Sequence, residues 1–204
     1  MITQHVHIST GNSKLGAMIP SVNLPVGITC RKDAPCRDKC YARKGRMSMQ
    51  RFTSLCERNL HIWDHDPDGY KRDILCAAAP SRFFRWHASG DIPDASYLEM
   101  MVGVAKALPK TNFLAFTKKW EMVNQFYDDN KVLPCNLTIV YSAWGTSLPE
   151  NPYSLPVAHI RLRNGASSIP ANAFQCQNFC GECVLGENHC WNLGFGQSVC
   201  FNEH

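Results

Sequence analysis

The hydrophobic positions between Met47 and Arg163 follow a helical period in some segments and a strand-like pattern in others. Apolar spacing predicts four helices: around 52–63, from Asp68 through Cys76, from Asp94 through Leu108, and over 120–128. Short apolar runs predict strands at 82–88, 112–117, 137–143 and 157–163, after an earlier apolar segment at 24–28. Strands separated by helices of this length indicate right-handed βαβ units, so we expect an α/β fold with a parallel sheet.

The pattern changes after residue 163. From Asn164 onward Gly, Asn, Gln and Cys dominate, and the hydrophobic periodicity disappears. A segment of this composition is not expected to build an apolar core, so something else must order it, and a metal centre would do so. We therefore expect a folded unit over residues 1–163 and a Cys-rich, metal-binding tail over residues 164–204.

Composition limits the classes of protein to consider. The chain has 204 residues, 45% of them hydrophobic, which fits one ordinary domain with a small appendage. No stretch approaches the roughly 18 apolar residues that span a bilayer, and the first residues lack the pattern of a secretory signal. We therefore expect a cytoplasmic protein without a membrane partner. The net charge of +4, without a block of like charges, permits a nucleic-acid partner but does not require one.

The cysteine content points to metal chemistry. Eleven is an odd number, and cytosolic thiols stay reduced, so a disulfide framework is not expected. Cys30, Cys36 and Cys40 form a C-x5-C-x3-C loop at 30–40. Three thiolates bind three irons of a [4Fe–4S] cube and leave the fourth iron open to a small molecule. Zinc, with a fourth ligand from outside the loop, and unligated thiols are the alternatives.

A second group of cysteines lies in the tail. Cys176, Cys180, Cys183 and Cys190 have the spacing C-x3-C-x2-C-x6-C, and four thiolates satisfy all four irons of a second [4Fe–4S] cluster. A four-cysteine zinc knuckle is the alternative, although such sites usually contain two C-x2-C pairs. Two neighbours are close enough in sequence to replace a ligand, His189 and Cys200. The remaining cysteines, Cys56, Cys76 and Cys135, are interpreted as structural.

The first loop carries a family resemblance. Three cysteines after a first strand, with Tyr41 following the last of them and βα units beyond, resemble the radical S-adenosylmethionine (SAM) superfamily. The same loop, with the segments 12–16 and 84–91, also resembles a phage and bacterial family, gene product eighty-eight of mycobacteriophages. The first resemblance implies a partial (βα) barrel, an open iron that binds SAM, and cofactor contacts from Tyr41, Ser89, Gly90 and Asp91.

Two departures accompany that resemblance. The usual cysteine spacing of the superfamily is C-x3-C-x2-C, and both gaps are longer here. Its Gly-Gly-Glu-like motif, which holds the SAM amino group, corresponds to Ser89-Gly90-Asp91, with Asp in place of Glu. The tail cysteines resemble the auxiliary clusters of the same superfamily, which relay electrons or hold substrate.

Polar side chains near the carboxyl ends of the predicted strands are candidates for a substrate site. Alternation places Arg85 and His87 on one face of their strand, and His159 and Arg161 on one face of theirs. Lys118 follows another strand. Barrel enzymes keep their sites at these strand ends. A cluster of cations there favours a small anionic substrate, although ion pairing within the protein or exposure to solvent explains the same residues.

The sequence thus favours an iron–sulfur enzyme of the radical-SAM type, with two [4Fe–4S] clusters, an external electron donor and a small anionic substrate. A second hypothesis is an iron–sulfur enzyme that binds substrate or sulfide at the open iron without SAM. A third is a non-catalytic module, stapled by metal, that binds nucleic acid or protein; its support is the mildly basic balance and the Lys118-Lys119-Trp120 run.

Overall fold

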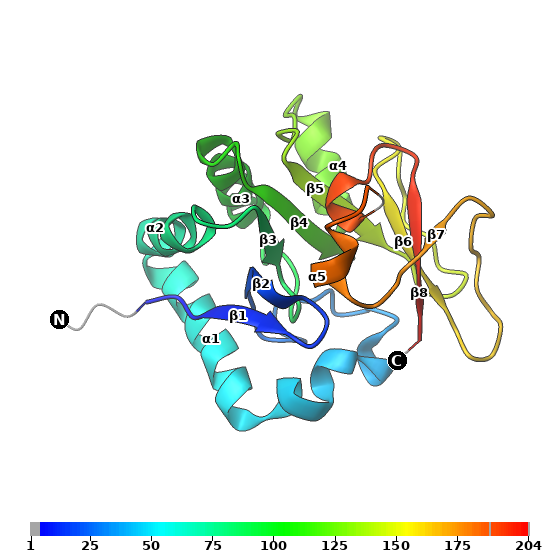
Figure 1. Cartoon of the computed structure of the whole chain (residues 1–204), viewed down its shortest axis with the longest axis horizontal. Coiled ribbons are helices and arrows are strands. Elements are labelled where there is room, and N and C mark those ends of the chain that lie inside the picture. Colours follow the sequence, from blue (N-terminus) through cyan, green and yellow to red (C-terminus); the bar gives the residue numbers. More distant parts are fainter. Residues whose placement is uncertain (1–4, 188, 204) are drawn as a thin grey trace.

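The structure, a computed structural model, describes residues 5–187 and 189–203 and has an α/β fold built on one open sheet (Figure 1). The strand order is β1-β2-β3-β4-β5-β6-β8-β7. All neighbouring strands are parallel except β1 and β2, which form an antiparallel hairpin. The strands are β1 (Ile8–Asn12), β2 (Gly16–Val22), β3 (Phe83–Trp86), β4 (Asn112–Thr117), β5 (Leu137–Ser142), β6 (Val157–Arg161), β7 (Phe174–Gln175) and β8 (Ser198–Asn202).

The helices connect the parallel strands as the apolar spacing predicts. They are α1 (Gln50–His65), α2 (Pro67–Ala78), α3 (Ala95–Ala107), α4 (Trp120–Asp128) and the single turn α5 (Cys180–Cys183). Asp94 caps α3 by accepting a hydrogen bond from the Tyr97 N–H at 2.8 Å, as expected. The cap of α2 is Asp66 rather than Asp68, because Pro67 begins the helix and the Gly69 N–H donates to Asp66.

The helical face of the sheet buries the larger apolar core. Phe84 and Trp86 on β3 point into it and pack with Tyr97 and Met101 of α3. Cys56, on α1, is buried as expected, whereas Cys76 on α2 is exposed. No helix in the described part of the chain is long and apolar enough to cross a bilayer.

The opposite face of the sheet buries a second apolar core, to which the C-terminal segment contributes. Val184, Trp191, Leu193 and Val199 pack there with residues of β2 to β6, including Phe83. Strand β8 also pairs in parallel with β6 over five residues. The expectation that residues beyond 163 lack an apolar core is therefore wrong: their few apolar side chains are spaced irregularly, but together they cover one face of the sheet.

The N-terminal hairpin is a further difference from the sequence prediction. The apolar segment 24–28 is a loop, and the first parallel strand is β2, which ends at Val22. In the hairpin turn the Asn12 side chain accepts hydrogen bonds from the Lys14 and Leu15 N–H groups, at 2.9 and 2.8 Å. Residues 1–4, part of the stretch in which no signal is expected, lie outside the described residues.

Candidate metal centres

The first cysteine loop leaves the carboxyl end of β2 and is held by short 3₁₀ turns. Cys36 precedes η1 (Arg37–Lys39), and Cys40 stands between η1 and η2 (Tyr41–Arg43). The Cys36 and Cys40 carbonyls accept hydrogen bonds from the Lys39 and Arg43 N–H groups, each at 3.1 Å. These turns bring the sequence-separated thiols of Cys30, Cys36 and Cys40 to one hollow.

That hollow is a cavity of about 320 Å³, and all three thiol-bearing residues line it. Among the described residues its lining contains Arg and Lys side chains but no His, Asp or Glu. The pKa of the Cys30 thiol is raised, chiefly by burial and also by the charges of Asp91, Cys40 and Cys36. A hydrogen bond from the Gly27 N–H to the Cys30 sulfur, at 3.4 Å, acts in the opposite direction. A thiol kept protonated in this way releases its proton when a metal binds.

Ser89-Gly90-Asp91 packs directly against the residues that lead into this loop. The Leu24 N–H donates to the Ser89 carbonyl at 3.0 Å, and the Asp91 N–H donates to Thr29 Oγ1 at 3.0 Å. Gly90 has φ +82°, and a Cβ there would lie 2.7 Å from the Leu24 carbonyl oxygen. The approach of these two backbones therefore requires glycine at position 90.

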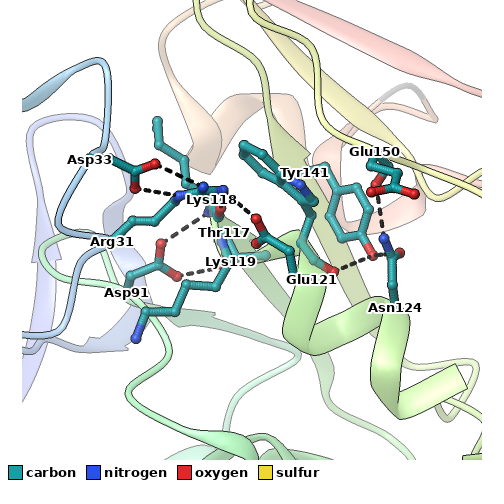
Figure 2. Close-up of polar contacts among 11 residues, drawn as sticks. Arg31, Asp33, Asp91, Thr117, Lys118, Lys119, Glu121, Asn124, Tyr141 and Glu150 are labelled. Carbon is teal, nitrogen blue, oxygen red and sulfur yellow. Dashed lines mark hydrogen bonds and ion pairs between the residues drawn. The ribbon is translucent and has the colours of Figure 1, made fainter. Parts of the chain in front are cut away.

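The Asp91 carboxylate is occupied by the protein's own donors (Figure 2). Oδ1 accepts from Thr117 Oγ1 at 2.7 Å and from the Ile92 N–H at 2.8 Å, and Oδ2 accepts from the Lys118 N–H at 3.0 Å. Burial raises the pKa of Asp91, whereas these hydrogen bonds lower it. Asp91 thus joins the end of β4 to the segment after β3, and its carboxylate has little remaining capacity for an ammonium group.

Tyr41 and Arg85 occupy the space between the two cysteine groups. The Tyr41 hydroxyl donates to the Ala88 carbonyl at 2.5 Å; 47% of the residue is exposed, but burial of the hydroxyl raises its pKa. The Arg85 guanidinium donates to the Trp86 carbonyl at 3.1 Å and lies 4.2 Å from the centre of the Phe116 ring. Burial lowers the pKa of Arg85, and Tyr41 and the tail thiols of Cys180, Cys190 and Cys176 raise it.

The tail cysteines are positioned by the sheet and by the hairpin. The Cys176 N–H donates to the Cys200 carbonyl at 2.8 Å, and the Cys180 N–H donates to the Lys14 carbonyl at 2.7 Å. Cys190 begins the 3₁₀ turn η4 (Cys190–Asn192), and burial raises the pKa of its thiol to about 12. The charges of Cys176, Cys180 and Cys183 contribute to this rise in the pKa of Cys190, whereas Arg85 opposes it.

The predicted substrate residues do not form a single cluster. Arg85 faces the tail, but His87 has φ 54°, which breaks the strand alternation and turns its ring toward the Tyr97 hydroxyl, 3.1 Å from Nε2. His159 is buried, and it follows Ala158 on β6, so the two side chains lie on opposite faces of the sheet. Ala158 belongs to the second core, to which the tail contributes. Arg161 is exposed. The expectation that His87 shares a face with Arg85 is therefore wrong.

Several residues that organise this region carry no recognisable signal in the sequence. The Asn23 side chain accepts from the Ala88 and Ser89 N–H groups at 2.9 and 3.0 Å, which ties β2 to the segment after β3. Arg31 bridges Asp33 and Glu121 (Figure 2). Asn23 lies far from Ala88 in the chain, and Arg31 lies far from Glu121, so only the fold reveals these contacts.

A family model described as Gene product 88 matches residues 3–191. The chain belongs to the Gene product 88 family. The matched range includes Cys30 through Cys190, and thus both cysteine groups of this Gene product 88 family member, and it ends before Cys200. No curated protein and no solved structure matches the chain significantly.

The donor side chains described for this family member do not form a site for one metal ion. Within residues 5–187 and 189–203, no three His, Cys, Asp or Glu side chains converge closely enough to hold a single metal ion. A cubane distributes its thiolates over four iron corners, so it takes its ligands from a wider space than one zinc ion does. Cys30, Cys36 and Cys40 line one cavity, and the charge of Arg85 interacts with three of the tail thiols, those of Cys176, Cys180 and Cys190.

Proposed function

We propose that the protein is an iron–sulfur enzyme with two [4Fe–4S] clusters, one of which binds S-adenosylmethionine at an open iron. The observation that carries the proposal is the cavity of about 320 Å³ with three thiols and no fourth protein ligand among its described lining residues. Cys30, Cys36 and Cys40 would hold three irons, and the unligated corner would face the cavity. Cys176, Cys180, Cys183 and Cys190 would hold the second cluster.

The arrangement of strands supports this function. Strands β2 to β6 are parallel neighbours in chain order, which is the order of strands in a (βα) barrel, although the sheet is open. The cysteine loop follows β2, and residues 89–91 follow β3, so the two segments meet at the carboxyl edge. Because the Asp91 carboxylate is occupied, the polar backbone of residues 89–91 would hold the amino group of the ligand.

The chain's own residues would orient the ligand and balance charge. Tyr41 fixes the end of the cysteine loop to the Ala88 carbonyl, and the half-buried Arg85 places a positive charge beside the tail thiols. What the bound cluster would supply is one electron, from an external donor, for cleavage of the sulfonium C–S bond into methionine and an adenosyl radical. The second cluster would serve as an electron relay, and an anionic substrate would fit the cations around the cavity.

Purification without oxygen, followed by iron, sulfide and zinc analysis, tests the cluster content. Two cubanes correspond to about eight irons and about eight sulfides per chain. Cys36→Ala should remove about half of each, and Cys183→Ala should remove the other half. Stoichiometric zinc without acid-labile sulfide would refute the proposal.

Electron paramagnetic resonance of the reduced protein tests the ligand of the open iron. Adding SAM should change the spectrum of the wild type and of Cys183→Ala, which serves as the matched control, but not that of Cys36→Ala. Reduction should also yield 5′-deoxyadenosine. If saturating SAM leaves the spectrum of cluster-replete protein unchanged, SAM is not the ligand, and a response to sulfide would then favour direct binding of substrate or sulfide at the iron.

A further inference from the structure

The positive charge of the chain is concentrated around the first cysteine loop. Eight of the 21 Lys and Arg residues fall within residues 31–51, together with only two Asp, so this segment carries a formal charge of +6 while the whole chain carries +4. The cations stand singly or in the pairs Arg31-Lys32 and Arg43-Lys44, so the concentration is not apparent as a long run in the sequence. We call residues 31–51 the basic segment.

The fold gathers these cations at the mouth of the cavity. Arg31, Lys32, Arg37 and Arg43 line it together with the three cysteines. The rest of the basic segment continues through η2 and η3 (Gly45–Ser48) to the start of α1. Except for Arg31, its Lys and Arg residues are exposed. Four of the eight cations therefore line the cavity, and the others follow along the chain toward α1.

Most of this charge has no acidic partner in the described part of the chain. Arg31 pairs with Asp33 and Glu121, and Lys39 pairs with Glu203 at 2.9 Å. The ion pairs among the described residues include none of the other six cations, which are Lys32, Arg37, Arg43, Lys44, Arg46 and Arg51. Exposed cations concentrated in this way favour a partner with many regularly spaced negative charges.

We propose that the basic segment binds the phosphodiester backbone of single-stranded nucleic acid and brings a nucleotide to the cavity. The unpaired cations extend from the cavity to α1, which is more surface than one phosphate group occupies. Ile28, just before the basic segment, and Met49, within it, are 66% and 59% exposed and add apolar surface. A single strand is favoured because a base paired in a duplex cannot enter a cavity. The role of this nucleotide as substrate rests on the proposed function. The binding of nucleic acid by the basic segment does not rest on it.

Fluorescence anisotropy with short labelled single-stranded DNA and RNA tests the proposal across a range of salt concentrations. The anaerobically purified protein is compared with Arg43→Gln/Lys44→Gln/Arg46→Gln. The matched control is Arg72→Gln/Lys106→Gln/Lys110→Gln, which removes the same charge from exposed positions on α2, at the end of α3 and just after it. The first variant should bind at least about tenfold more weakly, with a salt slope reduced by about 2, whereas the control should bind like wild type.

Equal weakening in both variants, or no binding by cluster-replete wild type at low salt, would overturn the inference. So would binding to vesicles of anionic lipid at concentrations where the oligonucleotides do not bind. The result is separable from the cluster proposal. If the protein contains zinc but binds oligonucleotide through residues 43–46, the cluster proposal is refuted and the nucleic-acid proposal is supported. If the protein contains both clusters but does not bind oligonucleotide, the cluster proposal is supported and the nucleic-acid proposal is refuted.

Discussion

His87 stands at the point where β3 ends and its backbone enters the left-handed region, with φ 54°. Its Nε2 lies 3.1 Å from the Tyr97 hydroxyl, which lies 2.7 Å from the Tyr70 hydroxyl. The residue is only 3% exposed, and burial, with the charges of Arg85 and Lys119, lowers its pKa to about 3. A neutral imidazole in a tyrosine network is a structural element rather than a substrate contact.

This environment predicts a dependence of stability on pH. Between the ordinary pKa of about 6.5 and the folded value of about 3, the unfolded chain binds a proton that the folded chain does not. The contribution is therefore complete above pH 6.5 and is lost as the pH falls. We expect wild type to lose about 2 kcal/mol more of its free energy of unfolding between pH 7 and pH 5 than His87→Asn. Asparagine tolerates positive φ and does not titrate, so parallel urea-unfolding profiles would exclude this role.

At the scale of elements, the C-terminal segment is divided between sheet and loop. Strand β8 lies between β6 and β7, and Trp191, 5% exposed, donates from Nε1 to the Phe84 carbonyl at 3.0 Å. By contrast α5 is a single turn without a buried residue, attached through the Cys180 N–H to the hairpin. Strand β8 and Trp191 are thus held by the sheet and the second core, whereas α5 has no buried residue of its own.

Hydrogen exchange should resolve these two parts. In Cys183→Ala we expect faster exchange over residues 176–187, with β8 still protected, because loss of metal should remove most order where the core contributes least. Cys36→Ala should instead open residues 30–48 and leave the tail unchanged. Loss of protection throughout 164–203 in Cys183→Ala would mean that metal, and not the second core, holds the whole segment.

The whole molecule has apolar cores on both faces of an open sheet, and neither core depends on the cysteine loop. The larger core joins α1 to α4 with β3, β4 and β5, and the second joins the tail to the other face. The fold should therefore survive without its proposed clusters. This distinguishes the protein from small domains that unfold when their metal is removed.

Removal of metal by a chelator under reducing conditions should leave the far-UV circular dichroism nearly unchanged while the loops at 30–48 and 176–187 become sensitive to protease. Trp191→Ala is the comparison, because it leaves a cavity in the second core and should cost about 3–5 kcal/mol of stability with the cysteines intact. Cooperative loss of the helical signal on chelation would show that the two cores are insufficient.

Local pattern was enough to predict much of this protein. The strands at 112–117 and 137–142, the helix at 120–128 and the Asp94 cap follow from spacing and capping chemistry within a few residues of each position. The two cysteine groups were equally visible, because the spacing of cysteines is a property of the chain itself.

The tertiary structure decided what the cysteines face and which residues meet. Alternation predicts His87 beside Arg85, but one positive φ turned it into the opposite core. The apolar side chains of the tail show no periodicity, and they form a core only together with residues on one face of the sheet. The contacts of Asp91 with Thr117 and of Arg31 with Glu121 join segments that are distant in the chain. Such contacts depend on strand order and packing, and no local pattern in the sequence specifies them.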